Sequence, residues 1–454
     1  MQSDRVPGEA SINIEDAAEA ILQAALNAGA EAADVIAMTG EADSVQIRLG
    51  AMEEVERHES RDIGLRVFVG RSSAIVSTNN LARDAITALA ERAVTIAASA
   101  PQDPHAGLAA RSELATSWPE LDLADAEQPQ IDSLADLARK AEDAARAQQG
   151  VTNSLGANAS AARSHFILLT SEGFSSGYET SRYSLSCSVV AGSGTAMQRD
   201  YDYTVARHFC ELEPAELIGR RAGERAVRMV GAKRIATGPI TVVYEPRAAA
   251  SLLGHFASAI NGRSIARGTS FLKERMGDQV FADAITIVDD PHRARGHNSR
   301  PFDGEGLLCQ RRELIAGGRL TGWLLDLASA RQLDLEPTAH ASRGIGSGPS
   351  PSASNLTIEP GTEAPEALIR DIKHGLYVTG LIGMGVNGVT GDYSRGAEGI
   401  AIENGELTGP VSEVTIASTL PEMFSRLIAA NDLEIRTGRD APTLLVEGMT
   451  LAGA

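Results

Sequence analysis

The sequence predicts an α+β protein of two domains: an N-terminal α/β-layered domain over residues 1–236 and a mostly antiparallel β domain with a few helices over residues 237–454. One observation behind this prediction is the length of 454 residues, which exceeds what a single hydrophobic core ordinarily organises. The others are the alternation of helical and strand-like patterns in the first half and the glycine-punctuated β segments in the second. Aromatic residues form only 4% of the chain, so Ala, Val, Ile and Leu must fill both cores.

The first hundred residues predict a layer of helix, strand, strand, strand and helix. Residues 14–30 carry Ala and Leu at helical spacing, whereas residues 33–50 alternate apolar and polar types as a half-buried hairpin would. Residues 62–80 hold two β-branched runs on either side of Gly70, which indicates a turn between two strands. Residues 81–100 then form a strongly periodic helix.

A similar order of elements returns further along the chain. Residues 100–130 are rich in Pro, Asp and Ala with weak periodicity, which indicates a long surface connection. A helix follows over residues 131–150, residues 151–210 are mostly strand-like, and residues 214–232 return to helix with a proline at their start. Although no sequence repeat is visible, this recurrence favours two similar layers that share one sheet.

The second domain is expected to be rich in hairpins. Residues 244–262, YEPRAAASLLGHFASAING, read as the end of a strand followed by an amphipathic helix that carries one histidine, His255. Beyond this helix, glycine-rich turns separate short β runs. Asn404-Gly405 is a strong hairpin signal, because these residues accept the positive φ angles of a type I′ turn.

The charge of the chain argues against nucleic acid as a direct partner. The formal net charge is -19 and the pI is about 5.0, whereas binding to a phosphate backbone depends largely on Lys and Arg. Five arginines cluster over residues 292–314, but acidic residues are interleaved among them, so we expect a solvated charged loop and hairpin there.

Other features of the composition predict a cytoplasmic protein without a membrane partner. Cys187, Cys210 and Cys309 are odd in number and lack CxxC spacing, so neither a disulfide framework nor a thiolate zinc site is indicated. The first residues show no basic stretch followed by an apolar one, and no run of about 18 apolar residues occurs.

The helix that carries His255 lacks most of what a zinc peptidase needs. Such a site requires two imidazoles on one helix face, a carboxylate that acts on the metal-bound water, and a third protein ligand. In an HExxxH register that ends at His255, the first histidine falls at Ala250 and the glutamate at Ser251. His292 and His297 lie in a loop among arginines that would repel a divalent cation, so a metal site is the less favoured interpretation there as well.

The remaining motifs are weaker. No strand-to-helix G-x-S-x-G elbow supports a serine nucleophile, and residues 344–355 lack the G-K-[ST] of a phosphate loop, so we expect a flexible loop there. Asp392, Tyr393 and Arg395 sit among glycines just before a strand, which places an acid, a phenol and a guanidinium at a sheet edge. This edge would bind an extended peptide or a partner, or else Asp392 and Arg395 serve a structural turn; the residues leave both interpretations open.

Four long segments resemble the TldD/PmbA family, and within it the PmbA (TldE) branch. They begin GLRVFVGRSS, SLLGHFASAINGRS, RPFDGEGLLCQRR and GMGVNGVTGDYSRG, and they cover residues 64–81, 251–291, 300–335 and 383–417. The resemblance implies a two-domain α+β architecture and a paired assembly, in which a TldD-like chain carries zinc and a TldE-like chain completes an enclosed site.

The same resemblance implies that this chain has lost its own metal site. The TldD branch places HExxxH on the helix that matches residues 250–255 and takes a cysteine near the C-terminus as a further ligand. Here Ala250 and Ser251 replace two of these residues, and no cysteine follows Cys309. His255 would be a vestige, with no cofactor and no catalytic residue in this chain, and zinc in the TldD-like partner. The implied substrates are unfolded or small modified peptides.

Two alternatives stay open at this point. The chain would be a self-sufficient zinc peptidase if His255 found ligands elsewhere, such as His292, His297 or His340. Alternatively it would be a non-catalytic regulatory binding protein, as the family's common label, modulator of DNA gyrase, suggests. Its acidic charge speaks against direct contact with DNA. Whether the chain forms a homodimer when alone is also open.

Overall fold

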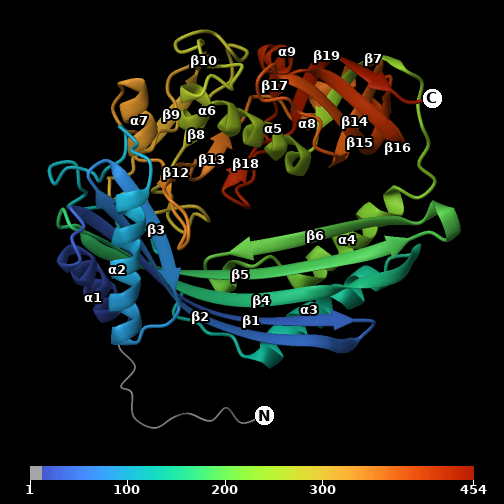
Figure 1. Cartoon of the computed structure of the whole chain (residues 1–454). Helices are drawn as coiled ribbons and strands as arrows, with labels where there is room; N and C mark the ends of the chain where they lie inside the picture. The colour runs from blue at the N-terminus through green and yellow to red at the C-terminus, as the bar shows by residue number, and fades with distance from the viewer. Residues whose placement is uncertain (1–12) are drawn as a thin grey trace.

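The computed structural model describes residues 13–454, which form two lobes (Figure 1). Residues 1–12, the start of the chain on which part of the localisation prediction rests, lie outside the described residues. The N-terminal lobe contains, in chain order, α1 (Ile14–Asn27), β1 (Ala32–Arg48), β2 (Ala51–Val69), β3 (Ser72–Thr78), α2 (Arg83–Ser99), α3 (Ile131–Arg146), β4 (Val151–Thr170), β5 (Ser175–Ala191), β6 (Gln198–Ala206) and α4 (Ala215–Arg228), with short 3-10 turns at Gly194–Ala196 and Phe209–Glu211.

The N-terminal lobe is one antiparallel sheet made of two similar halves. The strand order is β3-β2-β1-β4-β5-β6, so that β1 and β4 meet in the middle and each half contributes a helix, three strands and a second helix. Helices α1 and α2 form one hydrophobic core with their half, and α3 and α4 form another with theirs. The prediction of two similar layers that share a sheet is confirmed.

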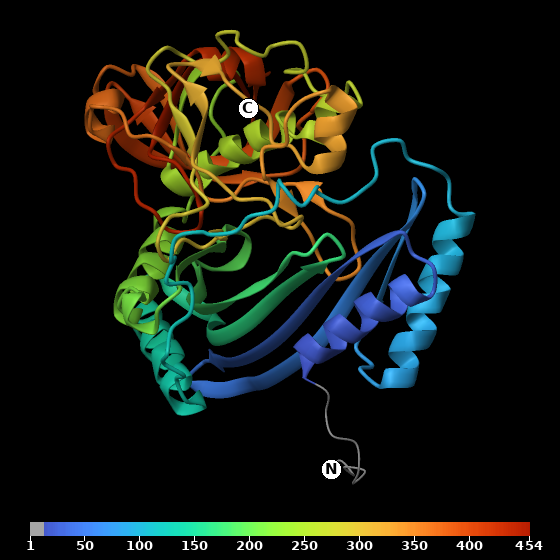
Figure 2. The same ribbon diagram turned by 90° about the vertical axis from the view of Figure 1, so that its left-hand side faces the viewer.

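All four helices cover the same face of this sheet. Side chains alternate along a strand, and the odd-numbered residues Val35 and Val45 of β1 lie in the helix-covered cores. The even-numbered residues Asp34 and Ile36 point to the opposite face, where Ile36 packs with Phe302 of the C-terminal lobe. Figure 2 shows the helices on the outer side of the curved sheet and the C-terminal lobe above its inner side.

The predicted hairpin over residues 33–50 is wrong, because β1 is one uninterrupted strand. It pairs with β2 on one side and β4 on the other, and Gly40 has Ser60 and Ser164 as its neighbours across the sheet. Residues 38–44 are partly exposed because they lie between the two helix pairs. The polar stretch that resembles a turn is the uncovered middle of a long strand.

The connection over residues 100–130 is irregular, as predicted, but it is not confined to the surface. Leu121 and Leu123 are buried, and the ring of Trp118 lies 5.1 Å from that of Phe302, measured between centroids. This segment passes between the lobes and supplies apolar side chains to their contact.

The C-terminal lobe contains a closed sheet and a second, smaller one. Its elements are β7 (Gly238–Tyr244), α5 (Pro246–Ala259), α6 (Gly262–Ala266), β8 (Ile287–Asp289), β9 (Arg312–Ala316), β10 (Arg319–Leu320), α7 (Leu327–Leu333), β11 (Ala341–Ser342), β12 (Ser350–Pro351), β13 (Leu356–Ile358), α8 (Pro365–Arg370), β14 (His374–Ile382), β15 (Asp392–Glu403), β16 (Glu406–Thr419), α9 (Leu420–Ser425), β17 (Leu427–Ala429), β18 (Arg439–Asp440) and β19 (Leu444–Ala452).

The larger sheet has the order β16-β15-β14-β7-β19-β17, and an additional pairing of β16 with β19 gives it the form of a barrel. The second sheet has the order β10-β9-β8-β13-β18. Only the pairs β7–β14 and β13–β18 are parallel among the described strands, so the α+β class with a mostly antiparallel C-terminal domain is confirmed. The hairpin at Asn404-Gly405 is also confirmed, since both residues have positive φ and join β15 to β16.

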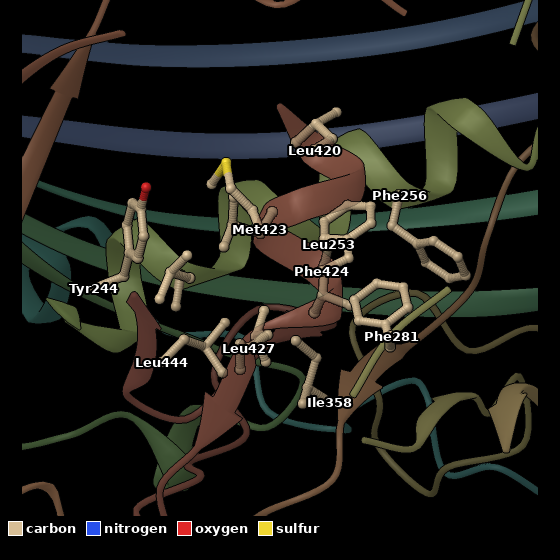
Figure 3. Close-up of a cluster of buried hydrophobic side chains, with 14 of the residues drawn as sticks. Tyr244, Leu253, Phe256, Phe281, Ile358, Leu420, Met423, Phe424, Leu427 and Leu444 are labelled. Atoms are coloured by element: carbon tan, nitrogen blue, oxygen red, sulfur yellow. The ribbon is translucent and has the colours of Figure 1, made fainter. Parts of the chain in front are cut away.

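Helix α5 is fixed by its apolar face. Leu253 and Phe256 are at most 1% exposed and pack in the core shown in Figure 3. The rings of Phe281 and Phe424 stack there with centroids 4.3 Å apart, and Phe256 contacts both. This anchoring leaves the opposite face of α5 to define a site.

The segment over residues 344–355, predicted to be a flexible loop, is exposed at residues 344, 346, 347 and 352 and packed against the protein at other positions. Ile345 lies against β2, where a Cβ on Gly64 would come within 2.0 Å of the Ile345 carbonyl oxygen. Ser354 and Asn355 are buried in the C-terminal lobe. The close approach of the two backbones depends on the missing side chain of Gly64 in β2.

Candidate functional site

A cleft of about 980 Å³ separates the two lobes beside α5. Its lower wall comes from β4, β5 and β6 of the N-terminal sheet, and its upper wall from α5, β14 and β15 (Figure 1). Ser251, which is partly exposed, and Ala248, at the edge of the core, line this cleft, so this side of α5 is turned toward it. The position that corresponds to a catalytic glutamate is therefore on the cleft wall.

The residues at the expected metal positions do not fit a zinc ion. Ala250 has no donor atom, and the Ser251 hydroxyl donates a hydrogen bond to the Ala248 carbonyl at 2.6 Å. Of the three HExxxH positions, only His255 carries an imidazole. Zinc requires at least three protein ligands of the His, Cys, Asp or Glu type, and α5 offers one.

The environment of His255 favours its neutral form. Its pKa is lowered by burial and by the cations Arg395 and Arg439. The ring meets Tyr393 edge-on with centroids 6.0 Å apart. Within residues 13–454, the buried His255 Nε2 has no hydrogen-bond partner, and the neighbour of the buried Tyr393 hydroxyl is the hydroxyl of Tyr244.

The structure brings two of the three predicted binding residues to this place. Tyr393 is 1% exposed and contacts His255, and Arg395, two residues further along β15, lines the cleft. Asp392 points away on the alternate face of the strand, where its carboxylate accepts a hydrogen bond from Thr390 Oγ1 at 2.6 Å. Asp392 thus belongs to the turn, whereas Tyr393 and Arg395 belong to the cleft side.

The alternative zinc ligands are dispersed. His340 is buried with Nε2 3.3 Å from Asp289 Oδ2 and Nδ1 2.8 Å from Thr338 Oγ1. His292 Nε2 lies 3.4 Å from the Pro301 carbonyl oxygen, and the pKa of His297 is lowered by burial and by nearby arginines. Across residues 13–454, no three His, Cys, Asp or Glu side chains are grouped so that they could hold a metal ion.

Sequence reasoning missed the charged residues that join the lobes at the cleft. Arg247, at the start of α5, donates to Asp200 Oδ1 and the Tyr201 carbonyl at 3.0 Å each, and to the Thr379 carbonyl at 3.2 Å. Its pKa is raised, because Asp200 and Glu245 outweigh the effect of burial. In the sequence, residues 244–247 (YEPR) show only that charged residues stand at the start of a helix, and they do not indicate which residues Arg247 contacts.

The expectation of a solvated charged loop over residues 292–314 is wrong for its central part. Asp303 and Glu305 are 1% and 5% exposed. Asp303 accepts hydrogen bonds from the backbone amides of Glu305, Leu307 and Ala341 at 2.9 to 3.0 Å, which satisfies its buried oxygens. Burial and the neighbouring Asp303 raise the pKa of Glu305 to about 8.

Next to these acids, a buried ion cluster ties the lobes together. Asp34 of β1 is contacted by Arg66 of β2, with Nε 3.0 Å from Oδ2, and by Arg343 of the C-terminal lobe through Nη1. Burial opposes ionisation of Asp34, but the two guanidiniums outweigh it and hold its pKa below the usual value. These residues are 32 and 309 positions from Asp34, so no sequence pattern pointed to their contact.

Comparison with known proteins gives matches along nearly the whole chain. Family models match as the PmbA/TldA metallopeptidase domain 1 over residues 33–97, the central domain over residues 124–230 and the C-terminal domain over residues 237–453. The metalloprotease PmbA homolog of Haemophilus influenzae is 36% identical over 413 residues, and the metalloprotease PmbA of Escherichia coli O157:H7 is 35% identical over 412 residues, with 90% of each chain covered in both cases.

Solved structures show the same fold. The crystal structure of a Bacteroides thetaiotaomicron protein described as a modulator of DNA gyrase superposes with a TM-score of 0.90 at 27% identity, over 98% of this chain and 100% of that one. The structure of TldE from Thermococcus kodakarensis superposes with a TM-score of 0.85 at 19% identity, over 96% of this chain and all of the other, which bears on the fold alone.

Proposed function

The chain belongs to the PmbA/TldD metallopeptidase family, and from this premise we propose that it is a metal-free, TldE-like subunit of a zinc metallopeptidase. In this proposal a TldD-like partner holds the zinc ion and performs hydrolysis. The present chain completes the enclosure around unfolded or small modified peptides and contributes the cleft wall on β15 that carries Arg395, with the buried Tyr393 on the same strand.

The observation that carries this proposal is the set of side chains on α5. The helix is anchored in the core of the C-terminal lobe, yet Ala250 stands at the first histidine position and Ser251 at the position of the catalytic glutamate. Ser251 is engaged with the helix backbone, and His255 lies beside two arginines that would repel a cation. Retention of the helix without the ligands favours a supporting role over a catalytic one.

The two alternatives receive less support. A self-sufficient peptidase would need further ligands near His255, but His292, His297 and His340 are not assembled with it among residues 13–454. A regulator that contacts DNA directly is disfavoured by the net charge of -19. The three free cysteines fit a reducing compartment, so we place the proposed complex in the cytoplasm.

The test is to measure zinc content and peptide hydrolysis for the chain alone and for the chain co-purified with a TldD-like partner. Each sample is equilibrated with trace zinc at neutral pH and dialysed before metal analysis. We expect zinc and hydrolysis of an unfolded peptide only in the co-purified complex, with no zinc in this chain. Stoichiometric zinc together with hydrolysis by the chain alone would establish the self-sufficient peptidase instead.

A further inference from the structure

The cleft between the lobes is lined by more arginines than carboxylates. Its lining includes Arg199, Arg247 and Arg395 together with the acids Asp200 and Glu398. Asp200 is already paired with Arg247, and the half-buried Glu398 interacts with Arg247 and Arg199, although burial and Asp200 raise its pKa overall. The lining therefore carries more guanidiniums than carboxylates, although the chain as a whole has a net charge of -19.

Arg395 is the clearest of these unpaired cations. Among residues 13–454 its guanidinium faces no carboxylate within ion-pair distance, and its one hydrogen bond runs from Nε to the Ile382 carbonyl at 3.4 Å. Arg247, by contrast, has two carboxylates and two carbonyls as partners. Arg199, which is exposed on β6 at the opposite wall, also forms no ion pair with a described residue.

A buried polar atom near Arg395 has unused hydrogen-bonding capacity. His255 Nε2 is buried and lacks a partner among the described residues, whereas the buried Tyr393 hydroxyl has the Tyr244 hydroxyl as its neighbour; Arg395 lies close enough to both residues to affect their pKa values. Unpartnered buried donors are rare in folded proteins, because each forfeits its hydrogen bonds to water. An anion beside Arg395 would compensate the charge that this buried neighbourhood leaves unpaired.

The rest of the cleft lining suits an apolar extended chain. Four large apolar side chains are exposed in it: Leu155 at 39%, Met197 at 57%, Tyr201 at 44% and Ile382 at 63%. They come from both lobes, which places apolar surface on both sides of the positive charge. Exposed apolar side chains gathered in one concave place indicate a binding site rather than ordinary surface.

From this combination we propose that the cleft binds a carboxylate carried by an extended apolar peptide, with Arg395 as its charged partner and Arg199 as a second cation on the facing wall. A guanidinium matches a carboxylate with two parallel hydrogen bonds, which neither a neutral residue nor a lysine reproduces. This inference rests on the proposed function and adds a charge preference to it. The α-carboxylate of a peptide end and an acidic side chain offer the same chemistry.

The experiment is calorimetric binding to the purified full chain, without any partner, at low ionic strength. The probes are three N-acetylated hexapeptides of alanine, leucine, valine and serine: one with a free C-terminal carboxylate, one C-terminally amidated, and one amidated with an internal glutamate. We expect at least one carboxylate-bearing peptide to bind at least about tenfold more tightly than the amide, as expected for a charge-assisted hydrogen bond. Which of the two binds identifies the source of the carboxylate.

The variants Arg395→Gln and Arg92→Gln decide whether the cleft is responsible. Arg395→Gln should abolish the difference between carboxylate and amide peptides, whereas Arg92→Gln removes an exposed charge on α2 and should leave the difference intact. Circular dichroism of both variants checks folding, and Arg395→Lys should restore only part of the preference.

Equal binding of all three peptides, no binding, or an equal loss in both glutamine variants would overturn the inference. These measurements involve neither zinc nor the partner. A failure here would therefore leave the zinc and hydrolysis results standing, and a failure of the subunit proposal would leave a measured carboxylate preference intact.

Discussion

Replacement of Asp34 by asparagine should destabilise the chain strongly, because Asp34 is the single acid shared by two buried arginines. Its side chain is 1% exposed, and those of Arg66 and Arg343 are 9% and 0% exposed. The asparagine keeps the shape but removes the negative charge, which leaves two guanidiniums facing each other away from water. Loss of one partner from a buried ion pair costs about 3–5 kcal/mol in the free energy of unfolding.

The pH dependence of this effect follows from the sign of the pKa shift. The pKa of Asp34 is lower in the folded chain than in the unfolded chain, where it is about 3.9. Such a group contributes stability above the unfolded pKa and loses it as the pH falls through the folded pKa. The difference between wild type and Asp34→Asn should therefore be full at pH 7 and shrink below about pH 4.

Urea unfolding followed by far-UV circular dichroism measures both effects. The matched control is Arg234→Gln, which breaks an exposed pair with Glu413 whose side chains are 55% and 69% exposed. The N–O distance in that pair is 2.6 Å, yet an exposed pair contributes at most about 1 kcal/mol. If Asp34→Asn cost no more than Arg234→Gln at pH 7, the argument that this cluster holds the lobes together would be refuted.

Three further predictions follow from buried groups and close contacts. The pKa of Glu305 is raised from 4.5 to about 8 in the folded chain, so ionisation of Glu305 destabilises the wild type as the pH rises through this range. The free energy of unfolding of Glu305→Gln should therefore increase relative to the wild type from about pH 4.5 to 8 and then level off, as measured by urea unfolding at several pH values. Gly219→Ala should lower the free energy of unfolding by about 1–3 kcal/mol in the same assay, because its Cβ would lie 1.9 Å from the Ala141 carbonyl oxygen between α3 and α4. The control Gly322→Ala should be near neutral, because no atom lies within 4 Å of its Cβ. A thiol reagent at pH 8 should label the native chain only at Cys210, because burial raises the pKa of the other two thiols to about 12, and Cys210→Ser should abolish the labelling.

Elements whose signals are local were predicted from the sequence, and those decided by neighbours were not. Helix α5 and the Asn404-Gly405 turn follow from apolar spacing and from backbone preference, and both are observed. The middle of β1 was misread because apolar-polar alternation is the same in a hairpin and in a single long strand. Only the pairing with β2 and β4 on both sides distinguishes the two, and that information is not local.

In the candidate site as well, individual residues could be predicted from the sequence, whereas their contacts could not. Tyr393 and Arg395 were singled out for their residue types, and His255 for its place on a helix, but no periodicity joins residues about 140 positions apart. The burial of Glu305 escaped prediction because the sequence shows a charge without showing what surrounds it. Backbone amides and arginines from several segments compensate the acids there, so an apparently solvated loop becomes part of the contact between the lobes.

The contrast between two arginines of the cleft bears on what the loss of metal ligands means for this chain. Carboxylates and carbonyls surround Arg247, so its charge is compensated by contacts that hold the lobes together. Arg395 has almost no protein partner, and a partly buried unpaired cation carries a desolvation cost that water or a ligand must offset. The unpaired guanidinium of Arg395 thus lies on the wall, formed by α5 and β15, where a metal ion would have been bound. Since a carboxylate needs cations where zinc needs their absence, the features that exclude zinc from this wall are those that suit it to an anionic peptide group.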